Sequence, residues 1–248
     1  MKYLSVCSGI EAVSVAWQPL GWQPAMFAEI DPFCVWLLRS RYGASRPIHM
    51  PSPNDAPTRK EAKQRAAAVR SIIAMPTAGA VSNFGDFTRI GVEHVGAIDL
   101  LAGGTPCQSF SIAGKRVGLD DPRGNLTIEF ARLAGRLRPL WLVWENVPGT
   151  ASTDIAGTLQ RDGDGGRADG VMTPQMAVRR LTPRECERLQ GLPDDYTLVE
   201  YRGKLAADGP RYKALGNSMA VPVMRWIGQR IAAVDAILRD GIDTGRVS

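Results

Sequence analysis

The sequence is poor in the residues that bind metals and form disulfides. Its 248 residues include only two histidines and four cysteines, and no two cysteines have the CxxC spacing. We therefore expect neither a metal site nor a disulfide framework. No apolar stretch approaches the length of a membrane span, and residues 1–5 (MKYLS) do not resemble a signal peptide. These absences predict a cytoplasmic chain.

Acidic residues are also slightly scarce, which leaves a formal net charge of +5 and a pI of about 9.2. Such a balance permits a nucleic-acid partner without requiring one. A hydrophobic content of 44% with 22% charged residues is ordinary for a globular enzyme. The length suffices for one large core and a small second domain.

The N-terminal part alternates strand and helix signals. Apolar runs at 3–6 and 25–28 are each followed by a turn and a helical pattern. Asp31 is placed to cap the second helix, Pro32 suits its first position, and Gly43 ends it. This order predicts an α/β fold with a doubly wound, mostly parallel sheet.

Residues 44–82 look like an insertion in this pattern. A stretch rich in proline and polar residues, 44–57, reads as a linker, and residues 58–61 (TRKE) form a capping box that opens a helix ending before Pro76. The helix has basic residues on its other faces: Arg59, Lys60, Lys63, Arg65 and Arg70. We interpret them as a solvated surface, with phosphate contact as the alternative.

Two later strands end in chemically reactive groups. The apolar run 98–102 continues into 103–108 (GGTPCQ), which places Cys107 on a loop at the carboxyl end of a buried strand. Ligands bind at such ends in open α/β sheets, and a deprotonated thiol there is a nucleophile. The alternative is that Cys107 is a small buried hydrophobe. The run 140–144 likewise leads directly to Glu145.

Further helices are expected at 125–137, after Thr182, and from Pro222 onward. Thr182, Pro183 and Glu185 form a capping box, and Leu181 with Cys186 can form a hydrophobic staple. The last helix is expected to bury one apolar face: Val223, Met224, Ile227, Ile231, Val234 and Leu238.

Polar groups after the first two strands suggest a nucleoside cofactor. The turn at Ser8 and Gly9 gives a ligand close access to the backbone, and Glu29 is placed to accept hydrogen bonds from ribose hydroxyls. Because the turn lacks a full GxGxxG, a dinucleotide oxidoreductase is the weaker interpretation. A purely structural alternative has Gly9 shaping a turn and Glu29 starting a helix.

Taken together, these segments resemble the DNA cytosine-C5 methyltransferases, especially the compact phage and prophage forms. The resemblance lies in eight segments in the family's order: 5–12 (SVCSGIEA), 28–31 (AEID), 85–87 (GDF), 103–111 (GGTPCQSFS), 121–126 (DPRGNL), 145–149 (ENVPG), 180–185 (RLTPRE) and 214–222 (ALGNSMAVP). It implies a Rossmann-like sheet that binds S-adenosylmethionine and acts on double-stranded DNA.

The resemblance also implies a catalytic group formed by Cys107, Glu145, Pro106 and Asn146. A Cys107 thiolate would add to cytosine C6, and a protonated Glu145 would hydrogen-bond N3 and the exocyclic amine. C5 would then accept the methyl group. Since the attack comes from above the ring plane, the base must be flipped out of the duplex.

By the same resemblance, one set of residues would form the S-adenosylmethionine site. Ser8 and Gly9 would approach the methionine part and Glu29 the ribose, while Asp31 has even chances of being only a helix cap. The expected cofactor-binding residues are Ser8, Gly9, Glu11, Glu29, Ile30, Asp86, Asn217, Ser218 and Val221.

The chain departs from the family after residue 149. We expect a catalytic domain at 1–149, a flexible linker rich in glycine and aspartate at 150–178, and a C-terminal helical segment at 179–240 that packs back on the catalytic domain. The linker replaces the target-recognition domain, and Gln160 with Arg161 does not form the family's QxRxR element. We therefore expect recognition of the DNA sequence to be reduced or absent, and the arginine that contacts the flipped cytosine in this family to be absent.

Three hypotheses follow. The chain is a DNA cytosine-C5 methyltransferase of a restriction-modification or prophage system, completed where necessary by a second chain that supplies target recognition. Alternatively, it is a truncated remnant that binds S-adenosylmethionine without turnover. An oxidoreductase with a redox cysteine has little support, because no resolving cysteine lies near Cys107.

Overall fold

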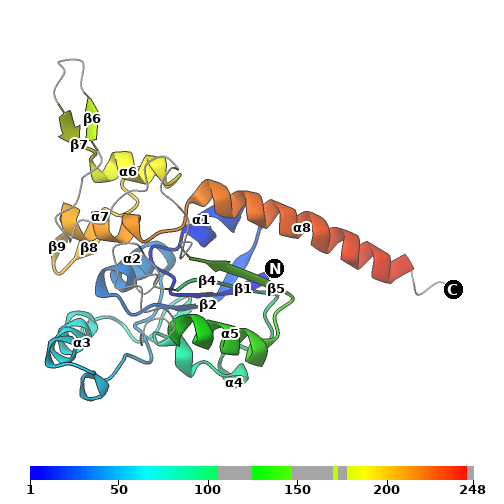
Figure 1. The fold of residues 1–248 in the computed structure, drawn as a ribbon, viewed down its shortest axis with the longest axis horizontal. Coiled ribbons are helices and arrows are strands. Elements are labelled where there is room, and N and C mark those ends of the chain that lie inside the picture. The colour runs from blue at the N-terminus through cyan, green and yellow to red at the C-terminus, as the bar shows by residue number, and fades with distance from the viewer. Residues whose placement is uncertain (106–124, 147–169, 173–177, 245–248) are drawn as a thin grey trace.

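The structure is a computed structural model that describes residues 1–105, 125–146, 170–172 and 178–244. Its centre is a sheet in which five parallel strands have the order β3-β2-β1-β4-β5 (Figure 1). Their bounds are β1 Lys2–Val6, β2 Gln23–Ala28, β3 Ser82–Asn83, β4 Leu100–Gly104 and β5 Trp141–Glu145. This parallel order confirms the predicted α/β fold.

Helices cover both faces of the sheet (Figure 1). Helices α1, α2, α6, α7 and α8 contribute to the core on one face, and α4 and α5 to the core on the other. The helices are α1 Ala12–Trp17, α2 Pro32–Tyr42, α3 Arg59–Ile72, α4 Val92–Val95, α5 Asn125–Leu137, α6 Pro183–Leu189, α7 Asp208–Gly216 and α8 Val221–Thr244. Short 3-10 turns lie at Gln18–Leu20, Pro53–Asp55 and Phe87–Arg89.

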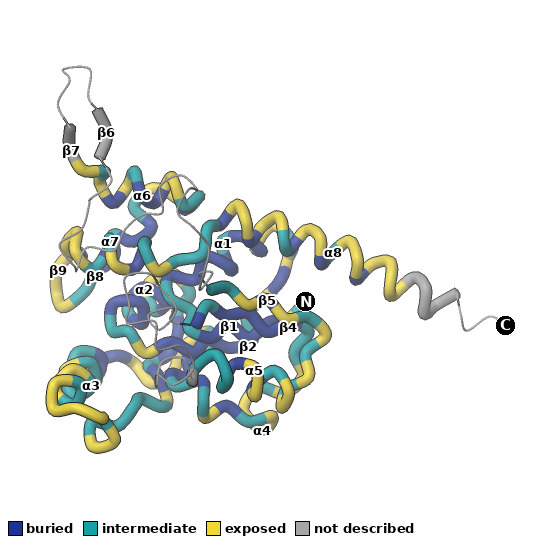
Figure 2. The backbone as a smooth tube through the Cα atoms, viewed as in Figure 1, coloured by how far each residue is buried: buried dark blue, intermediate teal, exposed yellow. Residues whose placement is uncertain are grey.

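Strand alternation explains the two cores. Along β1, Tyr3 points toward the α1 side, where it meets Trp17 edge to face, while Leu4 and Val6 pack on the α5 side with Phe130. A period of two places successive side chains on opposite faces of a strand. Figure 2 shows the result, a sheet whose central strands β1 and β4 are mostly buried between the two helical layers, while the edge strand β5 is partly exposed.

Local capping follows the sequence closely. The Asp31 carboxylate accepts from the backbone N–H groups of Phe33 and Cys34, so Asp31 is the N-cap of α2. Thr182 and Glu185 form the reciprocal capping box of α6. At α3 only half of the predicted box is observed, because the Thr58 hydroxyl accepts from Glu61 N–H while the Glu61 side chain pairs with Arg65.

The prediction for the last helix is wrong in part. Met224 and Ile231 are buried, but Val223, Val234 and Leu238 are exposed. A 24-residue helix is about 36 Å long, and α8 packs on α1, which has only six residues. The far half of α8 therefore extends beyond the sheet, as Figure 2 shows.

Part of the expected linker is structured. Residues Gly170–Met172 (β6) pair antiparallel with Val178–Arg180 (β7), although the sequence analysis assigned 150–178 to a flexible segment. A second small hairpin joins β8 (Glu200–Tyr201) to β9 (Lys204–Leu205). The remainder of 150–178, with Gln160 and Arg161, lies outside the described residues.

Within the described ranges, no helix is both long and apolar enough to cross a membrane. The same residues contain no cluster of three or more His, Cys, Asp or Glu side chains that could hold a metal ion.

Candidate functional site

A pocket lies at the carboxyl ends of β1 and β4. It encloses about 380 Å³, including the solvent at its mouth. The sheet register brings the strand ends together, because Val6 is aligned with both Ala28 and Gly103, and Gly104 with Glu145. The lining residues are 5–10, 12–13, 102–104, 145 and 217–219. The pocket is therefore lined by segments from both the N-terminal and the C-terminal parts of the chain.

The Ser8–Gly9 turn forms one wall of this pocket. The Ser8 hydroxyl donates to Ser5 O at 2.9 Å and accepts from Ala28 N–H at 3.3 Å, which ties the turn to the ends of β1 and β2. Gly9 has a φ of +55°, in the left-handed region that favours glycine. Ser8 and Gly9 both line the pocket, and the access of a ligand to their backbone stays a prediction.

Glu29 lies beside this turn at the end of β2. Its buried carboxylate accepts from Gly9 N–H at 2.6 Å and from Ile30 and Asp31 N–H at 2.7 Å each. Burial raises the pKa of Glu29, and the neighbouring Asp31 carboxylate raises it further. Ile30, in contrast, is 39% exposed, an apolar side chain left open next to a carboxylate.

Asn83 fixes the position of Glu29, and sequence reasoning missed it. Its side-chain oxygen accepts from Glu29 N–H and Gly85 N–H, both at 3.0 Å, and its amide donates to Glu29 O at 3.2 Å. Asn83 is completely buried. An asparagine in a two-residue strand was the only available signal, and it predicts no role by itself.

Glu11 does not line the pocket. Its carboxylate is fully buried and accepts from the hydroxyls of Ser5 and Ser14 at 2.8 and 2.9 Å. Burial raises the pKa of Glu11 to about 7, although these two hydroxyls act in the opposite direction. In this structure the carboxylate links the end of β1 to α1, and its expected contact with the cofactor stays a prediction.

Asp86 and Val221 also lie outside the lining of this pocket. Asp86 accepts from the N–H and hydroxyl of Thr88. Burial raises the pKa of the Cys7 thiol, and the carboxylates of Glu29 and Asp86 raise it further. Val221 is buried in the core, where its N–H donates to Gln190 O at 2.9 Å.

The segment around α7 closes the pocket from the other end of the chain. Asn217, Ser218 and Met219 line it. Lys213 of α7 pairs with Asp31 at 2.6 Å, so that Asp31 both caps α2 and holds the C-terminal segment.

Contacts from α2 to the 195–196 turn strengthen this attachment. Arg41 donates to the carbonyls of Asp195 and Tyr196, and the Tyr196 hydroxyl donates to Ile10 O at 2.8 Å. Because Ile10 also lines the pocket, this hydrogen bond connects the 195–196 turn directly to the pocket wall.

Glu145 brings an acidic group into the same pocket. It follows Trp144 at the end of β5, and burial raises the pKa of its carboxyl. A Cβ added at Gly104 would lie 2.9 Å from the nearer Glu145 carboxylate oxygen and 3.1 Å from the Met219 methyl. Glycine at position 104 therefore provides the space that this carboxyl occupies.

Thr105 joins the ends of β4 and β5. Its buried hydroxyl accepts from Trp144 Nε1 at 3.1 Å and from Asn146 Nδ2 at 3.2 Å. With two donors already bound, it donates its own hydrogen to the Thr127 hydroxyl, 3.1 Å away. Sequence reasoning treated Thr105 only as part of a motif. Pro106 and Cys107 follow it directly but lie outside the described residues.

Comparison with known proteins identifies the family. The sequence model of the family described as C-5 cytosine-specific DNA methylase matches residues 77–162 and 156–233. A protein of Escherichia phage P1 named DNA N-6-adenine-methyltransferase is 39% identical over 164 residues, which make up 61% of this chain and 17% of that protein. The type II methyltransferase M.AquIA of Picosynechococcus is 33% identical over 156 residues, 60% of this chain and 49% of its own length.

Solved structures agree on the fold. The Dnmt2 methyltransferase of S. pombe aligns with a TM-score of 0.56 at 12% identity, covering 94% of this chain and 99% of that one. A prophage-encoded E. coli protein, described as a DNA modification methyltransferase, aligns with a TM-score of 0.55 at 14% identity and the same coverage. The chain spans less than half the length of the curated relatives above. On the family match, which extends over more than half of its residues, this chain belongs to the C-5 cytosine-specific DNA methylases.

Proposed function

We propose that this protein transfers a methyl group from S-adenosylmethionine to C5 of a flipped cytosine in double-stranded DNA. The observation that carries the proposal is the position of Glu145, a carboxyl with a raised pKa in the same pocket as the Ser8–Gly9 turn and the 217–219 segment. One edge of the sheet therefore holds both a carboxyl that can donate a proton, Glu145, and a turn suited to a nucleoside cofactor, Ser8–Gly9.

The residues that line the pocket suit the methionine part of S-adenosylmethionine, which the Ser8–Gly9 turn and Asn217–Ser218 would hold. Glu29, Ile30 and Asp86 lie outside that lining; Glu29, bonded to Gly9 N–H, would reach the ribose hydroxyls, exposed Ile30 the adenine face and Asp86 the adenine amine. When bound, the cofactor supplies a methyl group on a positively charged sulfur. Glu29 keeps lone pairs for a ribose, since its two oxygens accept three backbone hydrogen bonds in total.

The chain's own groups would activate the cytosine. A Cys107 thiolate forms a bond to C6, and the displaced electron pair moves into the ring toward N3 and C5. Glu145 stabilises the charge on N3 by donating its proton, and C5 becomes nucleophilic enough to take the methyl group. Water acting as a base then takes the C5 proton, the S–C6 bond breaks to release the Cys107 thiolate, and N3 returns its proton to Glu145, which restores the aromatic ring. Because Glu145 must be protonated, we expect the rate to fall as pH rises through its raised pKa.

Cytosine is favoured over adenine as the acceptor despite the name of the phage P1 relative. The matching segment makes up only 17% of that protein, whereas the family model describes cytosine-specific enzymes. An adenine amine already has a nucleophilic nitrogen and needs no thiol, so the GTPCQ segment around Cys107 also supports cytosine. Hydrolysis of the labelled product DNA and chromatography separate 5-methylcytosine from N6-methyladenine.

The proposal is tested by trapping on DNA that contains 5-fluorocytosine, together with radiolabelled S-adenosylmethionine. Fluorine at C5 blocks the final elimination, so the enzyme should remain covalently attached to methylated DNA. Cys107→Ala should abolish the adduct, while the matched variant Cys186→Ala, on the buried side of α6, should retain it.

Calorimetric titration with S-adenosylmethionine accompanies the trapping experiment. Cofactor binding without adduct or transfer would replace the proposal by the remnant hypothesis. Neither binding nor adduct would reject both. If activity appears only after a second chain is added, the recognition part is supplied in trans.

A further inference from the structure

The insertion between α2 and β3 carries most of the net charge of the molecule. Residues 44–82 contain six Arg or Lys against two Asp or Glu, a net charge of +4 out of +5 for the whole chain. The pocket residues described above include none of these cations. The insertion therefore requires an explanation of its own.

Helix α3 of this insertion is firmly attached to the catalytic domain. Ile72 and Met75 pack with Val35 of α2 in a small buried cluster, and Trp36 Nε1 donates to Ser71 O at 3.1 Å. The Arg65 guanidinium donates to Ser52 O at 3.0 Å and pairs with Glu61 at 2.7 Å. These contacts fix which side of α3 faces the solvent.

The solvent side of α3 begins with three cations. Arg59, Lys60 and Lys63 are exposed, and spacings of three and four residues place them on one helix face. None of them has an acidic partner among the described residues, because the one carboxylate of this helix, on Glu61, is taken by Arg65. We call Arg59, Lys60 and Lys63 the α3 cluster.

The α3 cluster does not serve the stability of its own helix. Arg59 and Lys60 occupy the first turn, where the N–H groups carry partial positive charge. Cations there are unfavourable by a few tenths of a kcal/mol each, while anions are favoured. A stabilising role would place acidic residues at these positions, so the cluster is better explained by an external anion.

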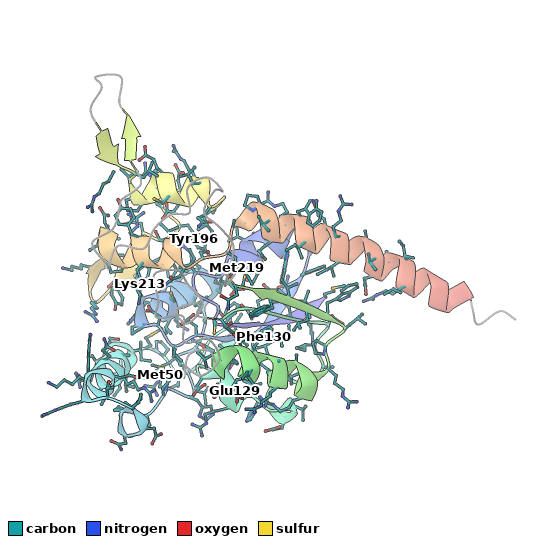
Figure 3. All side chains as sticks on the ribbon, in the orientation of Figure 1. Met50, Glu129, Phe130, Tyr196, Lys213 and Met219 are labelled. Atoms are coloured by element: carbon teal, nitrogen blue, oxygen red, sulfur yellow. The ribbon has the colours of Figure 1, made fainter. Side chains whose placement is uncertain are left out.

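The segment that leads into α3 starts at the edge of the sheet where the strands end. His49 lies beside Gly85 just after β3 ends, and Asp86 N–H donates to His49 O at 2.9 Å. From this edge the chain passes through the 3-10 turn at 53–55 into α3, and α3 remains in contact with that turn. In Figure 3 the side chains of α3 extend away from the body of the molecule, near Met50.

We propose that the α3 cluster binds the phosphate backbone of duplex DNA whose target cytosine occupies the pocket. The inference rests on the proposed function and adds a second contact surface to it. Three exposed, unpaired cations on a helix packed against α2 suit a row of phosphates, and phosphate contacts position a duplex without reading its sequence. The insertion thus provides nonspecific affinity in a chain shorter than its relatives.

The test compares two triple variants of the full chain. One neutralises the α3 cluster (Arg59→Gln, Lys60→Gln, Lys63→Gln), and the matched control removes three exposed cations elsewhere (Lys2→Gln, Arg136→Gln, Arg225→Gln), on β1, α5 and α8. Binding to a 20-base-pair duplex is measured by fluorescence anisotropy from about 50 to 200 mM salt. Each lost phosphate contact lowers the slope of log K against log salt by about 0.9.

We expect the cluster variant to lose about two to three units of that slope and at least tenfold in affinity at low salt, with the control close to wild type. Equal slopes for the two variants would overturn the inference. Unfolding in urea should show a cluster variant at least as stable as wild type, so a loss of DNA binding cannot be attributed to misfolding.

Cofactor titration separates this inference from the proposed function. Both triple variants should bind S-adenosylmethionine as wild type does, because none of the changed residues lines the pocket. If wild type forms the fluorocytosine adduct and the cluster variant binds DNA normally, only the α3 inference fails. If wild type binds no cofactor, the proposed function fails first.

Discussion

At the scale of single residues, the pocket depends on hydrogen bonds that join neighbouring strand ends. Asn83 connects the end of β2 to Gly85, and Thr105 connects the end of β4 to Asn146. Both side chains are buried and both are uncharged. Sequence motifs point to Cys107, Glu29 and Glu145, whose chemistry is visible in the residue type. Residues that hold them in place are visible only when the strand ends have been brought together.

The Thr105 hydroxyl should position the segment that carries Cys107. Thr105→Val removes the acceptor for Trp144 Nε1 and Asn146 Nδ2, two part-buried donors that can turn to water, so the loss should be about 0.5–1.5 kcal/mol. We expect lower stability in urea and a rate of fluorocytosine trapping at least tenfold lower. Thr105→Ser keeps the hydroxyl and should restore most of the rate. A Thr105→Ser variant as slow as Thr105→Val would show that packing, and not hydrogen bonding, is the cause.

Glu11 should make the stability of the protein depend on pH. Its pKa is about 7 in the folded chain, against about 4.3 when unfolded, so the folded state binds the proton more tightly. The stability provided by the protonated carboxyl is therefore complete below about pH 4.3 and is lost as pH rises through 7.

Glu11→Gln should remove that dependence, because an amide keeps contacts with Ser5 and Ser14 without a charge. Relative to wild type, we expect the variant to gain about 3 kcal/mol in free energy of unfolding between pH 4.5 and 8. Urea titrations of both proteins at these two pH values measure the difference. Parallel curves for the two proteins would contradict the role assigned to the Glu11 carboxyl.

At the scale of elements, the sequence predicted the interior better than the surface. The four longer strands of the sheet, the longer helices between them and the caps at Asp31 and Thr182 agree with the structure, because periodicity and capping are local properties, whereas the two-residue β3 and the four-residue α4 were not predicted. The predicted burial along α8 agrees only in part. The spacing of apolar residues defines one face of the helix, but it does not show how far along the helix the rest of the protein covers that face. The β6–β7 hairpin was missed since strands of three residues carry almost no periodic signal.

Two helical glycines should respond oppositely to alanine. At Gly228 in α8, a Cβ would lie 2.5 Å from a ring carbon of Trp17, whose indole N–H is held by Met224 O. At Gly135 in α5, nothing lies within 4 Å of the added carbon. Gly228→Ala should destabilise the protein by about 1–3 kcal/mol, whereas Gly135→Ala should stabilise it by up to about 1 kcal/mol.

Thermal unfolding of both variants measures the contrast, with wild type as the reference. A stabilising Gly228→Ala would mean that α8 can move away from α1 without cost, and that the close packing of the two helices is not required for the fold.

At the scale of the whole molecule, the pocket is assembled from the two ends of the chain. Residues 5–10 and 12–13 form one wall and 217–219 another, and Arg41, Lys213 and Tyr196 hold the second against the first. The sequence predicted this arrangement only through the family resemblance, since no local pattern relates Gly9 to Asn217. Long-range closure of this kind depends on the complete fold.

Cofactor binding should therefore stabilise both ends of the chain together. A ligand that binds only the folded state at 100 times its Kd adds about 2.7 kcal/mol to the free energy of unfolding. Because the ligand would contact both walls, we expect S-adenosylmethionine to slow amide hydrogen exchange in 5–13 and in 217–219 at the same ligand concentration. Lys213→Ala should weaken binding and reduce protection at 217–219 first, since it releases α7 from Asp31. Protection confined to 5–13 would mean that the C-terminal segment takes no part in holding the cofactor.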